Sequence, residues 1–241
     1  SRLGPAYLGK LNKQCMTLAE VLKSSGYGTY GVGKWHVGHE EKPTDRGFDE
    51  YYGYIRGHST SQWKVGNYLR LPEGKKPELE FDADDFYATD AFNDYAVEFL
   101  EQAQKKDEPF FLYLAYNAPH TPIQPPKDWF EKVKARENGI TAKRAKLVAL
   151  IEHLDHGIGQ VIDSLKANGQ WENTLTIFVS DNGGQLNVGG NCGNLRGGKQ
   201  DMYEGGLKVP ACAVWPGVIE AGKASEFPFL TMDLFPTALE A

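Results

Sequence analysis

The feature that most constrains the fold of this chain is a short apolar run at residues 110–115, with a long helical pattern on either side. Before the run, apolar residues at helical spacing predict a helix from Asp84 to Lys106, with cations at its carboxyl end. After the run, a second apolar stripe predicts a helix over 141–166. The run itself, Phe110-Phe-Leu-Tyr-Leu-Ala115, is typical of a strand that is buried on both faces.

Three other segments have the composition of strands, namely residues 27–33, 174–180 and 209–215. Strands that alternate with helices of this length are expected to pair in parallel, because each helix can serve as a crossover connection. We therefore expect an α/β fold, a sandwich in which helices flank a large, mostly parallel (mixed) central sheet.

The remaining segments read as caps and loops. Thr17-Leu-Ala-Glu20 has the pattern of a capping box that opens a short helix, and Gly26 is a suitable residue to end it. Residues 40–82 are rich in aromatic, glycine, proline and charged residues without a clear period. We interpret them as a long functional loop or a small insertion. Residues 183–198 form a second, glycine-rich loop.

The charge and composition of the chain argue against several classes of function. Its 241 residues have 41% hydrophobic residues and a net charge of −6, which suits a globular domain and disfavours nucleic acid as a partner. No apolar stretch reaches the ~18 residues that a membrane span needs. The chain begins at Ser1 without a methionine, so the lack of a visible signal peptide says nothing about a leader. The cysteine spacing fits no CxxC or zinc pattern and leaves open one disulfide among Cys15, Cys192 and Cys212.

Polar side chains follow three of the predicted strands. Gly33-Lys34-Trp-His36 follows the first strand, Asn117-Ala-Pro-His120 follows the second, and Asp181-Asn182-Gly-Gly follows the third. In open α/β sheets, ligands bind outside the carboxyl ends of the strands. We therefore expect these residues to belong to one active site: Lys34, His36, His120, Asp181 and Asn182.

The residue types suit the chemistry of a tetrahedral anion. Asp181 and Asn182 offer hard oxygen ligands for Ca²⁺ or Mg²⁺. Lys34, the histidines and Lys199 suit a bound sulfate or phosphate, and a histidine beside the leaving oxygen can act as a general acid. Taken singly, each is better explained as a turn or loop residue, so the hypothesis depends on their joint placement. The other histidines are interpreted as structural or surface residues: His39, His58, His153 and His156.

Several motifs occur in a fixed order over nearly the whole chain. They are Thr17–Gly38, Arg46-Gly-Phe-Asp49 with Tyr52-Gly53, Asn117–Pro122, Leu154–Gly159 with Ser180–Gly183, Leu195–Lys199, Tyr203–Gly206, Val209-Pro210, Trp215–Gly217 and Asp233–Thr237. In this order they resemble the sulfatase family of the alkaline phosphatase superfamily. The resemblance implies an alkaline-phosphatase-like α/β sandwich with a large mixed sheet and a smaller C-terminal domain.

The resemblance also implies a role for each candidate residue. Asp181 and Asn182 would bind a divalent cation, usually calcium. Lys34 and Lys199 would contact the sulfate. His36 would hydrogen-bond the nucleophile, and His120 would contact the sulfate or the leaving oxygen.

The sequence departs from the family pattern in two places. The family nucleophile is a formylglycine made from the Cys or Ser of a Cys/Ser-x-Pro/Ala-Ser-Arg motif, and no residue of this chain lies in such a motif. The family's paired acidic metal ligands are also missing, since Asp84-Asp85 reads as the start of a helix. We therefore expect residues 1–241 to be the central part of a sulfatase catalytic domain, without the nucleophile segment and the C-terminal subdomain, and to turn over little substrate alone.

The leading hypothesis is that the parent protein is a metal-dependent sulfuric ester hydrolase. Its substrate would be a sulfate ester, such as a sulfated glycan or an aryl sulfate. The alternatives are a phosphodiesterase or phosphonate monoester hydrolase of the same superfamily, or a non-catalytic sulfatase-like protein. The family favours a secreted, periplasmic or lysosomal location.

Overall fold

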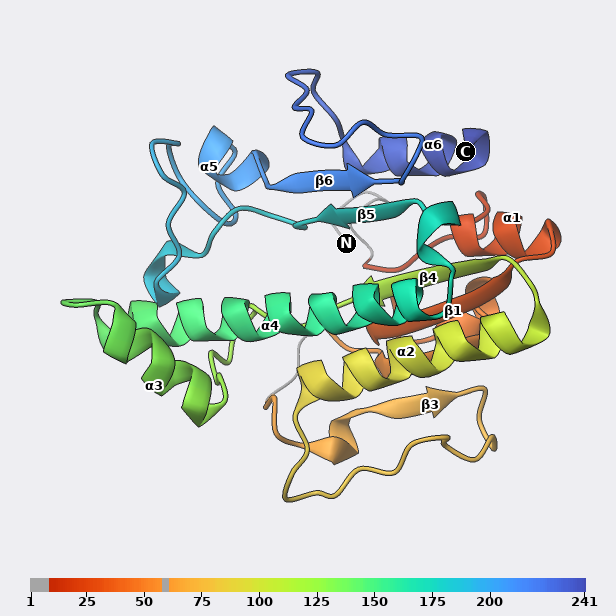
Figure 1. The fold of residues 1–241 in the computed structure, drawn as a ribbon, viewed down its shortest axis with the longest axis horizontal. Coiled ribbons are helices and arrows are strands. Elements are labelled where there is room, and N and C mark those ends of the chain that lie inside the picture. The colour runs from red at the N-terminus through yellow and green to blue at the C-terminus, as the bar shows by residue number, and fades with distance from the viewer. Residues whose placement is uncertain (1–8, 58–60) are drawn as a thin grey trace. The chain divides into compact units, whose positions relative to one another are not determined.

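The computed structural model describes residues 9–57 and 61–241, and the elements of these ranges are shown in Figure 1. The chain divides into two compact units, residues 1–164 and residues 165–241. The first unit holds the long helices and a four-stranded sheet, whereas the second holds a two-stranded sheet and a glycine-rich loop.

The sheet of the first unit is mixed. Its strands are β1 (Gly28–Lys34), β2 (Glu50–Tyr54), β3 (Leu69–Leu71) and β4 (Phe110–Ala115), in the order β3-β2-β1-β4. β1 is parallel to β2 and to β4, and β3 is antiparallel to β2. The strands predicted at 27–33 and 110–115 are confirmed, as is the α/β fold with a mixed sheet between helices.

The interpretation of residues 40–82 as a loop is wrong in part, because this segment supplies β2 and β3 as well as short 3₁₀ helices at Pro43–Arg46 and Val65–Asn67. β2 is fully buried, and its sequence Glu50-Tyr-Tyr-Gly-Tyr54 is rich in the aromatic residues that strands favour. The segment still contains long irregular stretches between these elements.

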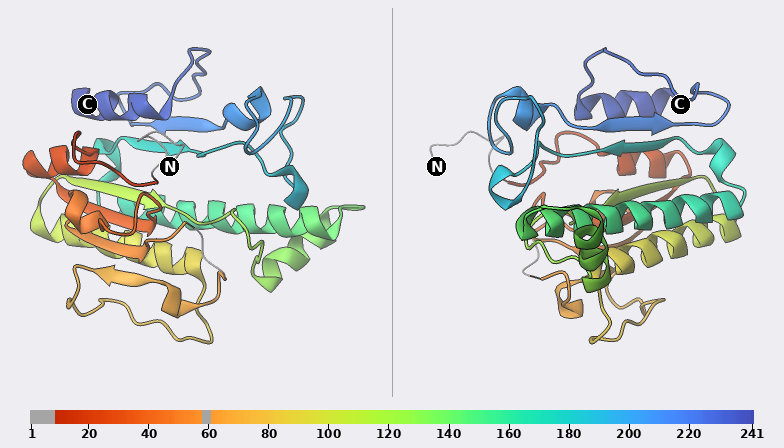
Figure 2. Two further views of the ribbon diagram at one scale, coloured as in Figure 1. Left: turned by 180° about the vertical axis from the view of Figure 1, so that it is seen from behind. Right: turned by 60° about the vertical axis from the view of Figure 1, so that its left-hand side comes forward.

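Helices cover both faces of the sheet. α2 (Ala88–Lys106) packs against one face, where Tyr52 of β2 stacks on Tyr95 with ring centroids 3.9 Å apart. α1 (Leu18–Ser24) packs against the other face, where Tyr51 and Phe48 belong to a second apolar cluster. Tyr51 and Tyr52 enter different clusters because successive strand residues point to opposite faces. α4 (Ala142–Ala167) runs beside α2 (Figures 1 and 2), and α3 (Lys127–Arg136) packs on α4.

The predicted helices occur close to their expected limits. Thr17 and Glu20 form both bonds of the capping box on α1, and Gly26 adopts φ +88° after its end. α2 begins at Ala88 rather than at Asp84, because Phe86 and Tyr87 are buried in the core in non-helical backbone. The expected burial of residues 110–115 on both faces is wrong, since β4 is an edge strand and Tyr113 is 47% exposed.

A buried arginine ties β3 to the segment that follows it. Arg70 donates two hydrogen bonds of 2.8 Å to the two carboxylate oxygens of Glu78, and it also contacts Glu50. Lys75 lies 3.0 Å from Glu78. Burial raises the pKa of Glu78, but the hydrogen bonds from Arg70 and Lys75 outweigh this effect and lower the pKa to about 2. The ionised carboxylate therefore stabilises the native state.

Glu78→Gln is expected to lower the free energy of unfolding at pH 7 by about 1 kcal/mol. The native pKa is depressed, so this contribution is complete above the unfolded-state pKa near 4.3 and is lost as the pH falls toward about 2. The difference between wild type and variant in chemical denaturation should therefore shrink between pH 5 and pH 3. Glu80→Gln, which changes an exposed glutamate two residues away, should show no such trend.

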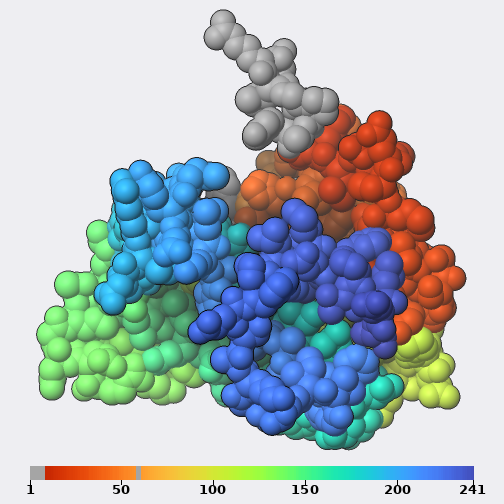
Figure 3. All heavy atoms as spheres, turned by 90° about the horizontal axis from the view of Figure 1, so that it is seen from above, coloured from red at the N-terminus to blue at the C-terminus, as the bar shows by residue number. Residues whose placement is uncertain are grey.

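The second unit contains β5 (Thr176–Val179) and β6 (Ala211–Val214), which pair antiparallel. Strands at 174–180 and 209–215 are confirmed, but their expected parallel pairing is wrong. The connection between them carries only a short 3₁₀ helix and the four-residue helix α5 (Glu204–Leu207). Neither is long enough to serve as the crossover helix that usually connects two parallel strands. α6 (Leu234–Glu240) follows a largely exposed segment whose dark-blue atoms lie at the surface in Figure 3.

Two further properties concern the whole described chain. Among residues 9–57 and 61–241, no helix combines the length and apolarity that crossing a bilayer would require. Cys15, Cys192 and Cys212 are free thiols, so none of them forms the disulfide that the sequence left open.

Candidate functional site

The first group of candidate residues follows the parallel strands β1 and β4. Lys34 is the last residue of β1, and the chain continues beside the end of β2. The N–H groups of Trp35 and His36 donate to the carbonyls of Tyr54 and Ile55 at 3.0 and 3.1 Å. His36 adopts φ +53°, a left-handed conformation that is uncommon for a residue with a side chain. The turn at His36 is therefore held by the backbone that follows β2.

His120 follows β4, the other neighbour of β1. Gly33 and Ala115 are paired residues near the carboxyl ends of the two strands, which places the Lys34–His36 and Asn117–His120 segments after the same edge of the sheet. The His120 N–H donates to the Asn117 carbonyl at 2.8 Å. The ring nitrogen Nδ1 lies 2.8 Å from the Thr121 carbonyl, which only an N–H can satisfy. This contact favours the tautomer of His120 that carries its hydrogen on Nδ1.

The close approach of the strands at this edge depends on glycine. A Cβ on Gly33, which adopts φ +106°, would lie 1.9 Å from the Ala115 carbonyl oxygen. The hydroxyl of Tyr51 also donates to the Gly33 carbonyl. The backbone that leads into Lys34 is therefore fixed on both sides.

The second group of candidates follows β5. Asp181 is exposed, and Asn182 Nδ2 donates to the Gly183 carbonyl at 3.0 Å. Gly183 donates to the Gly206 carbonyl, and a Cβ on Gly183 would lie 1.8 Å from the Gly205 carbonyl oxygen. Only glycine fits this crossing of two backbone segments. The glycine-rich loop is thereby folded back on the residues after β5.

Lys199 lies in this folded loop. Its N–H donates to the Gly184 carbonyl at 2.9 Å, so Lys199 is paired with the residue two positions after Asn182. The backbone of Lys199 is thus held against the segment that follows Asp181 and Asn182, within the second unit. Lys34, His36 and His120 belong to the first unit. The two groups of candidate residues therefore belong to different units.

Asp181 and Asn182 fit a hard divalent cation in the kind of donor that they offer. The Asn182 amide nitrogen donates to the Gly183 carbonyl, so the amide oxygen is the atom of this group that offers a ligand. Ca²⁺ takes 6–8 oxygen ligands, so two residues supply only part of a coordination shell. Within the described ranges, no three His, Cys, Asp or Glu side chains gather in a way that could hold a metal ion.

Of the remaining histidines, His58 is outside the described residues. His153 is buried on α4, where Nε2 lies 3.1 Å from Asp90 Oδ1 of α2 and the ring packs edge-on against Tyr87 and Trp129. His156 and His39 are exposed. His153 therefore joins α4 to α2.

Sequence reasoning did not find Tyr54 and Gly57, and it named Asn117 only as part of the motif that contains His120. The Tyr54 hydroxyl donates to Asn117 Oδ1, and the His36 imidazole lies against Gly57. Tyr54 and Gly57 were hidden in the segment that we interpreted as a loop. Asn117 lies in the motif that contains His120, and this proximity was the one signal available.

Comparisons with known proteins give one consistent result. The sulfatase family profile matches residues 2–241. The N-acetylgalactosamine-6-sulfatase of Canis lupus familiaris is 31% identical over 252 residues, which cover 96% of this chain and 46% of that protein. The crystal structure of Ps i-CgsB in complex with k-i-k-neocarrahexaose is 36% identical with a TM-score of 0.80, and the match covers 91% of this chain and 51% of that one.

A more distant solved structure shares the fold alone. A protein of the alkaline phosphatase superfamily from Vibrio parahaemolyticus is 17% identical with a TM-score of 0.52, over 90% of this chain and 44% of that one. The alkaline-phosphatase-like fold that the sequence predicts is therefore confirmed. The chain spans about half the length of the curated relatives that it matches.

Proposed function

The chain belongs to the sulfatase family, and we propose on this basis that it carries part of an active site that hydrolyses sulfate esters. The observation that carries the proposal is the family match over nearly the whole chain. It is supported by the placement of Lys34, His36 and His120 after the carboxyl ends of neighbouring parallel strands. An edge of this kind is where α/β sheets bind their ligands.

In this proposal the cationic and imidazole side chains have separate tasks. Lys34 and Lys199 bind the sulfate oxygens and stabilise the negative charge that develops on them. His36 hydrogen-bonds the nucleophile. His120 transfers a proton to the leaving oxygen through Nε2, because its Nδ1 hydrogen is already engaged by the Thr121 carbonyl.

Asp181 and Asn182 would hold a divalent cation, most simply Ca²⁺ with Mg²⁺ as the alternative, through the carboxylate and amide oxygens that follow β5. When bound, such a cation neutralises charge on the sulfate group. The further ligands and the formylglycine nucleophile are proposed to come from residues other than 1–241, since no cysteine or serine of this chain lies in the family's nucleophile motif.

The proposed substrate is a sulfated glycan, and an aryl sulfate would serve as its laboratory substitute. Support comes from the relatives, one of which is named for N-acetylgalactosamine 6-sulfate and another of which was solved with a neocarrahexaose. Sulfated glycans occur mainly outside the cytosol, so we also propose a secreted, periplasmic or lysosomal location.

The test is an assay of the full-length protein, matured to formylglycine, on 4-nitrophenyl sulfate, on sulfated oligosaccharides and on bis(4-nitrophenyl) phosphate. We expect cleavage of the sulfate esters, and a loss of about 10²-fold or more in Lys34→Ala. Lys76→Ala, which changes an exposed lysine, is the matched control and should keep full activity. Cleavage of the phosphate diester alone would favour the phosphodiesterase alternative, and no cleavage at all would favour a non-catalytic relative.

A further inference from the structure

The segment that follows β2 lies against the imidazole of His36. A Cβ built on Gly57 would lie 2.4 Å from Nε2 and 2.9 Å from Cε1 of that ring. The ring therefore occupies the space that a side chain at position 57 would need. The backbone of His36 is held by the same segment, because its N–H donates to the Ile55 carbonyl at 3.1 Å.

Tyr54, the last residue of β2, reaches the loop of His120. The Tyr54 hydroxyl donates to Asn117 Oδ1, and the side chains of both residues are almost fully buried, at 4% and 3% exposure. The carbonyl of Asn117 in turn accepts the N–H of His120 at 2.8 Å. Burial raises the pKa of Tyr54 well above its usual value, so the hydroxyl remains a donor throughout the physiological range.

The amide nitrogen of Asn117 shows that this side chain is held through its amide oxygen. Asn117 Nδ2 is buried and has no hydrogen-bond partner among the residues that the structure describes. A buried donor without a partner is unfavourable, so the other contacts of the side chain must hold it in place. Within the described structure, the side-chain contact that does so is the hydrogen bond from Tyr54.

From these contacts we propose that residues Tyr54–Gly57 position both histidines of the first group. Gly57 sets the orientation of the His36 imidazole by leaving room for it, and Tyr54 sets the His120 loop through Asn117. The roles of the two histidines rest on the proposed function, whereas their placement does not. Tyr54 and Gly57 are positioning residues, because each acts through another side chain.

Gly57→Ala in the full-length protein tests the first contact. The added methyl group must displace the His36 ring, and we expect kcat on 4-nitrophenyl sulfate to fall about 10-fold or more with little change in KM. Gly66→Ala is the control, because a Cβ on Gly66 would have nothing within 4 Å. Equal activity of the two variants would overturn the role of Gly57.

Tyr54→Phe tests the second contact by removing one hydroxyl. If Tyr54→Phe misplaces the proton donor His120, the loss of kcat should depend on the leaving group of the substrate. We expect about a 10-fold lower kcat on a sugar sulfate, which leaves as a basic alkoxide, and a smaller loss on 4-nitrophenyl sulfate. Tyr52→Phe is the control, since Tyr52 lies on the same face of β2 and is 5% exposed. Equal losses on both substrates, or equal losses in both variants, would contradict a positioning role.

A measurement without substrate separates this inference from the proposed function. In the full-length protein labelled with [¹³Cε1]histidine, Gly57→Ala should shift the His36 resonance and leave that of His120, and Tyr54→Phe should do the reverse. These shifts in a protein without sulfatase activity would sink the proposed function and keep the positioning role. Unshifted histidine resonances in both variants would overturn the positioning role, whatever the activity.

Discussion

Asp181→Asn is expected to lower the rate of sulfate-ester hydrolysis by the full-length protein by about 10²–10³-fold and to weaken Ca²⁺ binding by at least about 10-fold. Asp181 is an exposed carboxylate two residues after the end of β5, and the amide of its neighbour Asn182 donates to the Gly183 carbonyl. The substitution removes one negative charge and keeps the shape of the side chain. Initial rates across a range of Ca²⁺ concentrations, together with calorimetric titration of the metal-free protein, measure the two effects.

Asp155→Asn is the matched control for this experiment. It removes the same charge from an exposed position on α4 and should change neither the rate nor the affinity for Ca²⁺. If Asp181→Asn behaves like this control, Asp181 is only the first residue of an ordinary Asp-Asn-Gly-Gly turn. A loss of rate with unchanged Ca²⁺ affinity would assign Asp181 a role other than metal binding.

The strands and helices with uninterrupted patterns could be predicted from sequence alone. Residues 110–115 form an unbroken apolar run, and α4 shows a stripe over 26 residues, so each has one obvious structure. β2 could not be recognised in this way. Its five residues include a glutamate and a glycine, and it is a strand because aromatic side chains from α2 and from residues 68–86 bury it. Such burial depends on residues that are distant in sequence.

The same limit applies to the candidate site. The positions of Lys34, His36 and His120 follow from the rule that polar residues after strands meet at one edge, and the sequence therefore predicts them. The contributions of Tyr54 and Gly57 depend on the pairing of β2 with β1, which aligns Tyr54 with Lys34. The register between β1 and β2 cannot be read from the sequence of either strand alone. Likewise, the pairing of Lys199 with Gly184 depends on two glycine backbones that cross within the loop.

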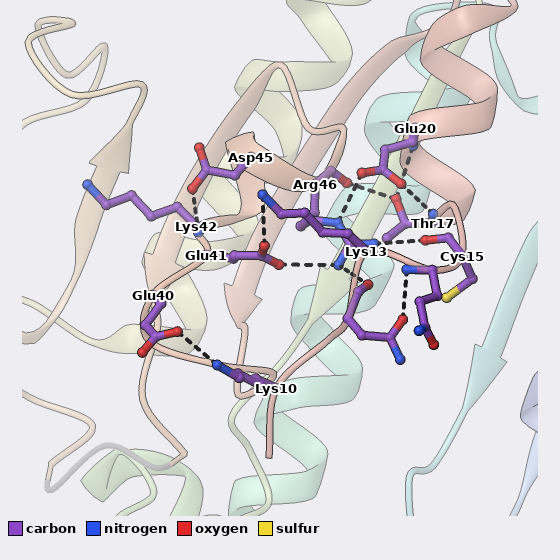
Figure 4. A network of polar contacts seen from close by, with 12 residues as sticks. Lys10, Lys13, Cys15, Thr17, Glu20, Glu40, Glu41, Lys42, Asp45 and Arg46 are labelled. Atoms are coloured by element: carbon purple, nitrogen blue, oxygen red, sulfur yellow. Dashed lines mark hydrogen bonds and ion pairs between the residues drawn. The ribbon is translucent and has the colours of Figure 1, made fainter. Parts of the chain in front are cut away.

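The largest expected effect on stability belongs to Arg46, a residue that the sequence marked only as part of a motif. Its guanidinium is 2% exposed and lies at the centre of the network in Figure 4. It donates to the carboxylates of Glu20 and Glu41 at 3.0 and 3.3 Å. It also donates to two backbone carbonyls, those of Asn12 and Cys15, at 3.1 Å each. Arg46 therefore ties the segment before α1 to the 3₁₀ helix that precedes β2.

Arg46→Ala is expected to lower the free energy of unfolding by about 3 kcal/mol, because it leaves two partly buried carboxylates and two carbonyls without their donor. For a chain of this size the melting temperature should fall by roughly 6–12 °C. Arg136→Ala is the matched control. Arg136 also pairs with two glutamates, but it is 53% exposed, so its removal should change stability by at most about 1 kcal/mol.

The pH dependence of this effect distinguishes the ion pair from simple loss of packing. The hydrogen bond from Arg46 holds the pKa of Glu20 below its usual value. A depressed carboxyl pKa stabilises the native state above the unfolded-state value near 4.3 and ceases to do so as the pH falls through the native pKa. The gap in unfolding free energy between wild type and Arg46→Ala should therefore narrow below about pH 4. A gap that is constant from pH 7 to pH 3 would assign the loss to packing, and a gap no larger than that of Arg136→Ala would show that the buried network contributes little.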